Sequence, residues 1–206
     1  MSFYENRVLP WMIDLACSPQ PIMDLRAEVV PLAYGEVLEV GMGSGLNLAL
    51  YDPGKVTRVW GLEPSAGMRR KAEKHLAGAA VPVQLLDLPG EEIPLADQSV
   101  DCVVLTFTLC TIPDWRKALQ QMHRVLKADG LLLFCEHGLA PDAPVQKWQQ
   151  RLTPLWKTCA GGCHLNRPVL ACLAEAGFRV SQSRTFYMDK APKIAGYMTL
   201  GQAVKA

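Results

Sequence analysis

Three glycines at alternate positions, Gly41, Gly43 and Gly45, directly follow an apolar run that ends at Val40. A glycine-rich loop after a strand brings backbone N–H groups close to a ligand, because side chains there would collide with it. A dinucleotide loop has its third glycine three residues after the second, and here that position is Leu46. The spacing therefore argues against a dinucleotide, and a purely structural turn is the alternative.

The next signal is Glu63, which ends a second apolar run about 20 residues beyond the loop. A carboxylate at the end of this strand can accept both ribose hydroxyls of a nucleoside that lies across the strand ends. The alternative is an acid near the start of the following helix, worth a few tenths to about 1 kcal/mol. Together with the loop, Glu63 favours a nucleoside cofactor.

The loop, with an acid two residues ahead of it at Glu39, resembles the cofactor loop of class I methyltransferases that use S-adenosylmethionine (SAM). The segment 90–101 is similar to the stretch before the fourth strand in the ubiquinone-biosynthesis type of methyltransferase. The resemblance covers residues 36–170. It implies SAM as cofactor, methyl transfer as activity and a Rossmann-like α/β fold, whose mostly parallel seven-stranded sheet has an antiparallel final strand.

The resemblance also implies a set of cofactor-binding residues. The Asp-Ala pair usual at the adenine is replaced by Pro89 and Gly90, which leaves Asp87, or the backbone of Gly90 and Glu91, as the adenine's partner. The end of the fourth strand is expected under the methionine part of SAM. The predicted set is Glu39, Gly41, Gly43, Gly45, Glu63, Pro64, Met68, Gly90, Glu91, Thr106 and Leu109.

A narrower resemblance rests on the region of Cys110, on Glu136 with His137, and on the stretches 154–156 and 162–167. This combination is similar to methyltransferase-like proteins that methylate alkyl thiols. Members of that family carry an N-terminal hydrophobic anchor, which we do not find in this sequence, so we expect a soluble bacterial-type relative. Phospholipid N-methyltransferases share the loop and the fourth-strand pattern and compete with this interpretation.

His137 is the best candidate for a catalytic base, because it ends the predicted fifth strand at the edge of the site. Methyl transfer from a sulfonium needs mainly alignment of donor and acceptor, an effect that supplies about 7 to 11 kcal/mol. A thiol, with a reference pKa near 8.5, needs only a weak base, whereas a hydroxyl needs a dedicated one. The alternative for His137 is a hydrogen bond to the loop after the strand.

Strand-like runs alternate with helical patterns, which is typical of a parallel sheet covered by helices. We expect one domain over 1–206, with an N-terminal helical lid at 1–34 and a helical cover after the fifth strand at 141–166. Glycine is expected to end the helix at 114–126 in the turn 127–130. The predicted strands are 36–40, 56–62, 83–87, 102–107, 130–136, 178–187 and 194–204, and the other helices are 46–51, 65–76 and 167–176.

The composition gives no indication of several function classes. With 21 basic and 20 acidic residues among 206, the net charge is +1, so we expect no nucleic acid partner. No apolar stretch approaches the roughly 20 residues of a membrane-spanning helix and no signal peptide is recognised, so we expect a cytoplasmic protein, with peripheral membrane contact left open. Seven cysteines without a Cys-x-x-Cys pair predict neither a disulfide framework nor a metal.

The sequence thus predicts a SAM-dependent methyltransferase that acts on a small molecule, with a thiol as the preferred acceptor. Two further hypotheses stay open within that cofactor class: methylation of a phospholipid or small amine, and a SAM-binding protein without catalysis. A nicotinamide dehydrogenase is disfavoured by Leu46 and by the absence of a second catalytic domain.

Overall fold

The computed structural model describes residues 4–206, and its centre is one seven-stranded sheet with the order β3-β2-β1-β4-β5-β7-β6. All neighbouring strands are parallel except that β7 runs antiparallel between β5 and β6. This confirms the predicted fold class. The strands are β1 (Gly35–Val40), β2 (Val56–Leu62), β3 (Val83–Leu86), β4 (Val100–Thr106), β5 (Leu126–His137), β6 (Phe178–Tyr187) and β7 (Tyr197–Lys205).

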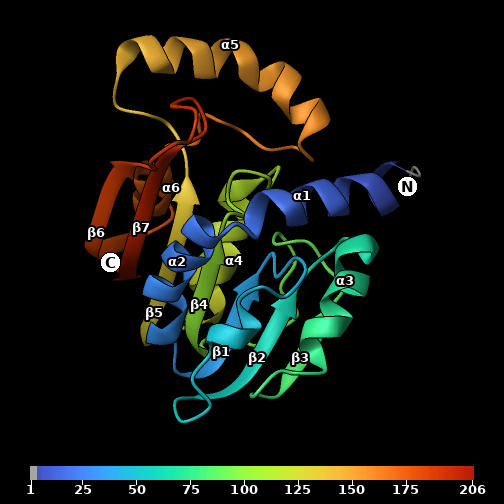
Figure 1. Ribbon diagram of the computed structural model, residues 1–206. Coiled ribbons are helices and arrows are strands. Elements are labelled where there is room, and N and C mark those ends of the chain that lie inside the picture. Colours follow the sequence, from blue (N-terminus) through green and yellow to red (C-terminus); the bar gives the residue numbers. More distant parts are fainter. Residues whose placement is uncertain (1–3) are drawn as a thin grey trace.

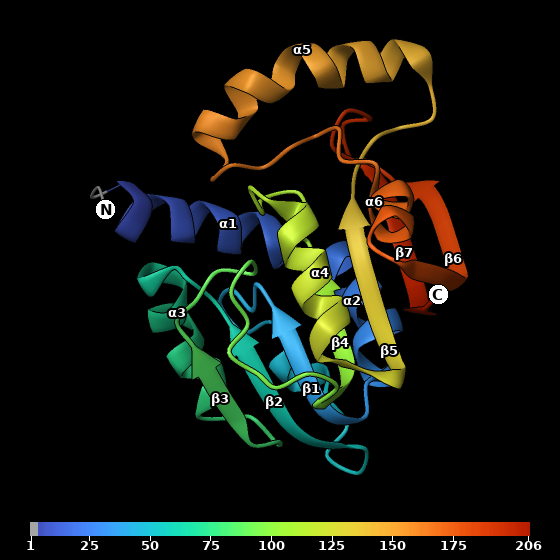
Figure 2. The ribbon, with the colours of Figure 1, turned by 180° about the vertical axis from the view of Figure 1, so that it is seen from behind.

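Helices cover both faces of the sheet, as Figures 1 and 2 show from opposite sides. Alternate strand residues point to opposite faces, so the two faces form separate cores. Leu38 and Phe134 belong to the core under α4 and α6, whereas Val37 and Leu133 belong to the core under α2 and α3. The helices are α1 (Leu9–Cys17), α2 (Gln20–Val29), α3 (Ala66–Leu76), α4 (Trp115–Val125), α5 (Ala143–Cys159) and α6 (Val169–Glu175), with short helical turns at Tyr4–Val8, Val30–Leu32 and Leu48–Leu50.

The helix predicted at 46–51 is wrong, because only one 3₁₀ turn forms there, at Leu48–Leu50. The chain becomes extended at Tyr51, whose side chain is buried in the core under α2 and α3. The Tyr51 hydroxyl donates to Glu39 Oε2 at 2.8 Å, and this contact draws the segment away from a helical path. Residues beyond the glycine loop therefore fill the core and do not extend as a helix.

The predicted turn at 127–130 is also wrong. Helix α4 ends at Val125, Leu126 is already extended and pairs with Val100, and residues 127–130 form an irregularity of β5 before regular pairing resumes between Leu131 and Cys102, with β5 extending to His137. Gly130 does not have the expected positive φ. Glycine is required there for another reason, since a Cβ would lie 2.6 Å from Leu126 Cδ1 and 2.9 Å from the Asp101 carbonyl oxygen.

Helices α1 and α5 lie beyond the carboxyl ends of the parallel strands, whereas α2 packs on a face of the sheet (Figure 1). Tyr4 joins the N-terminal segment to α5, because its hydroxyl donates to the Cys159 carbonyl at 2.7 Å. The buried Gln149 amide fastens α5 to the body through the carbonyls of Gly138 and Leu165. A segment predicted as a lid therefore touches the segment predicted as a cover, although residues 1–3 of that lid lie outside the described residues.

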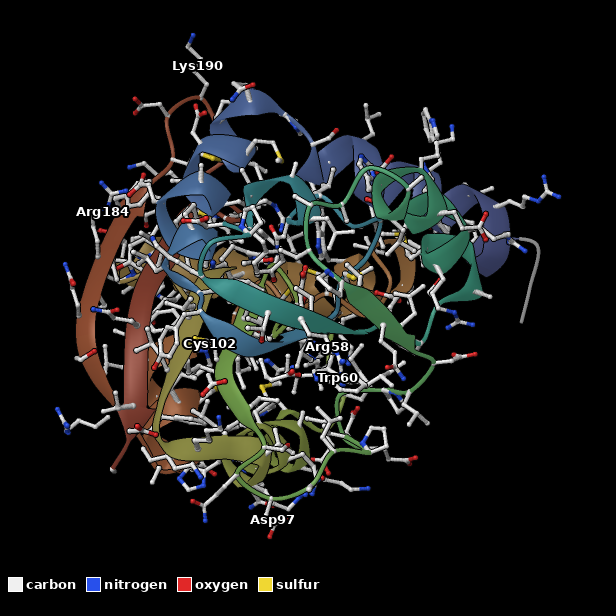
Figure 3. The ribbon with its side chains drawn as sticks, turned by 90° about the horizontal axis from the view of Figure 1, so that it is seen from below. Arg58, Trp60, Asp97, Cys102, Arg184 and Lys190 are labelled. Atoms are coloured by element: carbon white, nitrogen blue, oxygen red, sulfur yellow. The ribbon has the colours of Figure 1, made fainter. Side chains whose placement is uncertain are left out.

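Figure 3 labels side-chain contacts on two well-separated strands of the sheet, β2 and β6. On β2 the Arg58 guanidinium lies 5.1 Å from the Trp60 ring centroid. On β6 Arg184 forms an ion pair with Glu28 of α2 at 2.8 Å. Within the described part of the chain, no helix combines the length and hydrophobicity needed to cross a bilayer.

We predict that Gly130→Ala lowers the free energy of unfolding by about 1 to 3 kcal/mol, because the new Cβ has to displace β4 backbone or the Leu126 side chain. Denaturant unfolding measures the change. Gly78→Ala is the matched control, since its Cβ would meet nothing nearer than 3.9 Å and should change stability by less than about 0.5 kcal/mol. Equal losses in both variants would contradict the packing account.

Candidate functional site

A cavity of about 280 Å³ opens at the carboxyl ends of β1, β2 and β4. Parallel α/β sheets bind ligands at this edge. The N-terminal helix closes one side through Leu9, Pro10 and Ile13. The predicted residues Gly41, Gly43, Glu63, Pro64, Met68, Gly90 and Glu91 all line the cavity.

The glycine loop takes a backbone path that side chains disfavour. Gly41, Gly43 and Gly45 have φ angles of +68°, +61° and +81°. A Cβ on Gly41 would overlap the Thr108 side chain, whereas a Cβ on Gly43 would point toward Met68 Cε, 3.3 Å away. The loop therefore needs glycine both for its conformation and to leave the cavity open.

Glu63 lies at the junction of the loop with the next strand and helix. Its Oε2 accepts the Gly43 N–H at 2.9 Å and its Oε1 accepts the Ser65 N–H at 2.8 Å. Burial raises the pKa of this carboxyl above its usual value, against the opposing effect of these two hydrogen bonds. Each carboxylate oxygen keeps a free lone pair, so Glu63 can accept hydroxyls from a ligand while it holds the loop.

A recess of about 50 Å³ adjoins the cavity, and both are lined by Gly41, Gly43 and Phe107. Arg26 of α2 reaches this recess, is 6% exposed, and has a buried Nε without a hydrogen-bond partner. Its Nη1 donates to Asn47 Oδ1 at 2.9 Å and to Thr106 Oγ1 at 2.7 Å. A buried, incompletely satisfied guanidinium next to a cavity is suited to bind an anionic group.

Four of the predicted cofactor residues do not line the cavity. Glu39 is buried behind the loop, where Asn47 Nδ2 and the Tyr51 hydroxyl each donate to it at 2.8 Å. Thr106 lies in the recess beside Arg26. Gly45 packs against Leu48 and His75, and Leu109 is fully buried with its N–H donated to Glu136. These residues support the site from behind.

The two proposed partners of an adenine differ in position. Asp87 is engaged by Arg69, whose Nη2 donates to its Oδ2 at 2.6 Å, and it does not line the cavity. Gly90 and Glu91 do line it. Of the two alternatives, only Gly90 and Glu91 lie where a ligand in the cavity could reach them.

His137 lies outside the cavity, in a cluster with Cys110 and Cys163 whose donor atoms all lie within 4.8 Å of one another. His137 Nε2 is 3.3 Å from Cys163 Sγ, and its buried Nδ1 has no partner. Hydrogen bonding from Cys110, followed by the nearby imidazole, lowers the pKa of the Cys163 thiol. The cluster adjoins the cavity wall, since Thr111 and Gly161 both line the cavity.

Sequence reasoning missed Arg26 and the association of the two cysteines with His137. A signal for Arg26 was present, because helical spacing puts it on the apolar face of α2 with Leu25 and Val29. For the cluster, the stretches of the narrower resemblance contain Cys110, His137 and Cys163, but these residues lie far apart in the chain and only the fold shows that they meet.

Comparison with known proteins agrees with this geometry. Residues 38–134 match a family model described as a methyltransferase domain. The chain is 35% identical over 175 residues to the human thiol S-methyltransferase TMT1B, covering 82% of this chain and 69% of that protein. The rat TMT1B is 38% identical over 147 residues, which is 69% of this chain and 59% of that protein.

The fold comparison points the same way. A SAM-dependent methyltransferase from Leishmania major superposes with a TM-score of 0.70 at 16% identity, over 97% of this chain and 80% of that one. The chain belongs to the SAM-dependent methyltransferase family. It spans only about three fifths of the rat relative's length.

SAM is the cosubstrate of this family, and the residues present fit it. Its ribose carries two hydroxyls for Glu63, and its methionine carboxylate matches the orphaned guanidinium nitrogen of Arg26. Glycine at 41 and 43 keeps the space between these two groups free of side chains.

We predict that the buried carboxyl of Glu39 makes stability fall as pH rises from about 4.5 to about 7. Burial raises its pKa to about 7 in the folded protein from 4.5 in the unfolded chain. In this window the folded state holds a proton that the unfolded state has lost, so ionisation opposes folding. The free energy of unfolding of Glu39→Gln, relative to that of the parent, should therefore rise by on the order of 2 to 3 kcal/mol between pH 4.5 and 8.

Urea unfolding of the two proteins across this pH range measures the difference. Taking the difference cancels the contribution of Glu136, whose pKa burial also raises to about 7. A constant gap between Glu39→Gln and the parent would contradict a protonated Glu39.

We predict that two substitutions separate the contributions of the ribose contact and of the carboxylate contact to SAM affinity. Glu63→Gln should weaken both SAM and 5′-methylthioadenosine by about 10- to 100-fold, because both ligands carry the ribose. Arg26→Met should weaken SAM by a similar factor and leave 5′-methylthioadenosine nearly unchanged, because that ligand has no carboxylate. Calorimetric titration supplies the four affinities. Loss of both ligands in Arg26→Met would indicate a purely structural role for Arg26.

Proposed function

We propose that this protein transfers the methyl group of SAM to the sulfur of a small-molecule thiol. The support comes from the side chains that line the cavity. Among its described lining residues, only Glu63 and Glu91 carry an acidic or basic side chain. Glu63 holds the loop, and Glu91 accepts the Asp114 N–H at 3.1 Å.

An acceptor without a strong base nearby has to be a good nucleophile by itself. A thiol ionises with a reference pKa near 8.5, so a usable fraction is thiolate at neutral pH. An alcohol depends on a positioned base for about two to four orders of magnitude in rate. The cavity wall at Phe107, Thr111 and Ile112 offers no such group. The names of the human and rat relatives point to the same acceptor class.

The chain's own residues bind and orient the two reactants. Glu63 takes the ribose, Arg26 takes the methionine carboxylate, and the backbone at Gly90 and Glu91 takes the adenine. When bound, SAM supplies an electrophilic methyl group on a positive sulfonium. Leu9, Ile13 and Gly161 close the cavity on the acceptor side and exclude water. The protein therefore acts mainly by holding donor and acceptor in line.

The base role predicted for His137 stays a prediction, and the geometry restricts it. Its Nε2 faces Cys163 and its Nδ1 is buried, so neither nitrogen faces the cavity. Proton transfer from an acceptor in the cavity to His137 would have to pass through Cys163. The proposed function does not depend on that route.

We predict that an alkyl thiol is methylated at least about 100-fold faster than the alcohol of the same carbon skeleton, because the cavity lacks the base that the alcohol needs. Transfer of isotope-labelled methyl to each acceptor, followed by mass spectrometry, measures the rates. The amine of the same skeleton tests the N-methylation alternative. Faster methylation of the amine would overturn the thiol assignment, and SAM binding without any product would favour the non-catalytic alternative.

A further inference from the structure

The cluster of Cys110, His137 and Cys163 is the feature that the proposed function uses least. Among the residues that the structure describes, it is the one group of three metal-ligand side chains whose donor atoms lie mutually within 4.8 Å. Cys110 is buried, and the other two side chains are half-buried. Two sulfurs and one imidazole nitrogen form a donor set that suits zinc and disfavours magnesium or calcium.

The backbone around the cluster fixes the position of its ligands. Gly161 and Gly162 have φ angles of +59° and +86°, which end α5 and turn the chain back toward β4. The next residues are then fastened to Cys110, whose carbonyl accepts the His164 N–H at 2.8 Å. Arg167 donates to the Ile112 carbonyl at 3.1 Å. One backbone hydrogen bond and one from the Arg167 side chain therefore hold the segments of Cys110 and Cys163 together.

We propose that Cys110, His137 and Cys163 bind a zinc ion with an open fourth position, and that this position takes the sulfur of the methyl acceptor. Ligands of one tetrahedral zinc ion lie about 3.5 to 3.8 Å apart, given Zn–S and Zn–N bonds of about 2.3 and 2.0 Å. His137 Nε2 and Cys163 Sγ are 3.3 Å apart, and all three donors lie within 4.8 Å. Side-chain rotations smaller than a rotamer change would thus bring the donors to bonding distance.

The open position gives the site a chemical use that a closed four-ligand site would lack. Catalytic zinc sites keep three protein ligands and leave the fourth position to water or substrate. A thiol that binds zinc loses its proton, here to solvent, and keeps a sulfur lone pair for the methyl group. This part of the inference rests on the proposed function. The zinc ion would replace the base that the cavity lacks, and His137 would be one of its ligands.

The position of the cluster fits this role. Thr111 follows Cys110 directly, Gly161 lies two residues before Cys163, and both line the cavity. A zinc-bound sulfur would therefore enter the cavity from the wall at Thr111 and Gly161. Two alternatives use the same atoms: a thiolate–imidazole pair without metal, and a disulfide between Cys110 and Cys163.

Metal content of the full chain, purified under reducing conditions without a metal-affinity step, tests the site directly. Elemental mass spectrometry should find one zinc per chain in the parent and in Cys172→Ala, which removes a buried cysteine outside the cluster. Cys110→Ala and Cys163→Ala should each retain at least tenfold less zinc. SAM titration reports whether each variant is folded. A parent without zinc, or with a Cys110–Cys163 disulfide in peptide mapping, would overturn the proposal.

Cobalt(II) substitution tests the ligands without relying on any variant. Apo parent protein titrated with cobalt alone should develop thiolate-to-cobalt charge-transfer absorption that saturates at one equivalent. An alkyl thiol should raise this absorption by about half, since two thiolates become three, and the alcohol of the same skeleton should not. If the absorption does not change when the thiol is added, the proposal that the thiol binds at an open fourth position is overturned.

These readouts also separate the inference from the proposed function. If the protein binds zinc but methylates no thiol, the metal site stands and the thiol assignment fails. If the metal-free protein methylates thiols as fast as the zinc form, the proposed function stands and the role of the metal is overturned.

Discussion

The backbone conformation of the loop after β1 is the constraint on which the site depends. Three glycines in the left-handed region let the chain pass over Thr108 and present the Gly43 N–H to Glu63. Because Glu63 also accepts the Ser65 N–H, one carboxylate fixes the loop, the end of β2 and the start of α3 together. The cavity exists because no side chain from this loop enters it. Replacing any of these contacts would affect both the fold and the space for the cosubstrate.

Behind the glycine loop, a network of buried polar side chains holds the charged Arg26 guanidinium in position. Glu39 accepts from Asn47 and Tyr51, and Asn47 accepts from Arg26. Burial keeps the pKa of Glu39 near 7, so its charge is only partly developed at neutral pH. The positive charge of the buried Arg26 is thus only partly compensated, and the carboxylate of an incoming ligand can neutralise it. We regard Glu39 as a support for this arrangement and not as a ligand of SAM.

The sequence predicted the features that depend on local residue patterns. Strand alternation with amphipathic helices identified the sheet, and the spacing of the glycines and Glu63 pointed to residues that line the cavity. The prediction from sequence patterns failed where tertiary contacts determine the local structure. Residues 46–51 do not form the predicted helix, and Gly130 is needed for close strand packing and not to end a helix. The sequence did not show that Cys110, His137 and Cys163 meet, because they lie far apart in the chain, in two loops and at the end of β5.

A crystal structure with S-adenosylhomocysteine and a methylated thiol product would test the central claim most directly. The account predicts the ribose hydroxyls on Glu63, the carboxylate on Arg26, and the thioether sulfur of the product between Thr111, Gly161 and the cluster of Cys110, His137 and Cys163. Binding of the nucleoside away from Glu63, or of the product on the far side of α1, would contradict it.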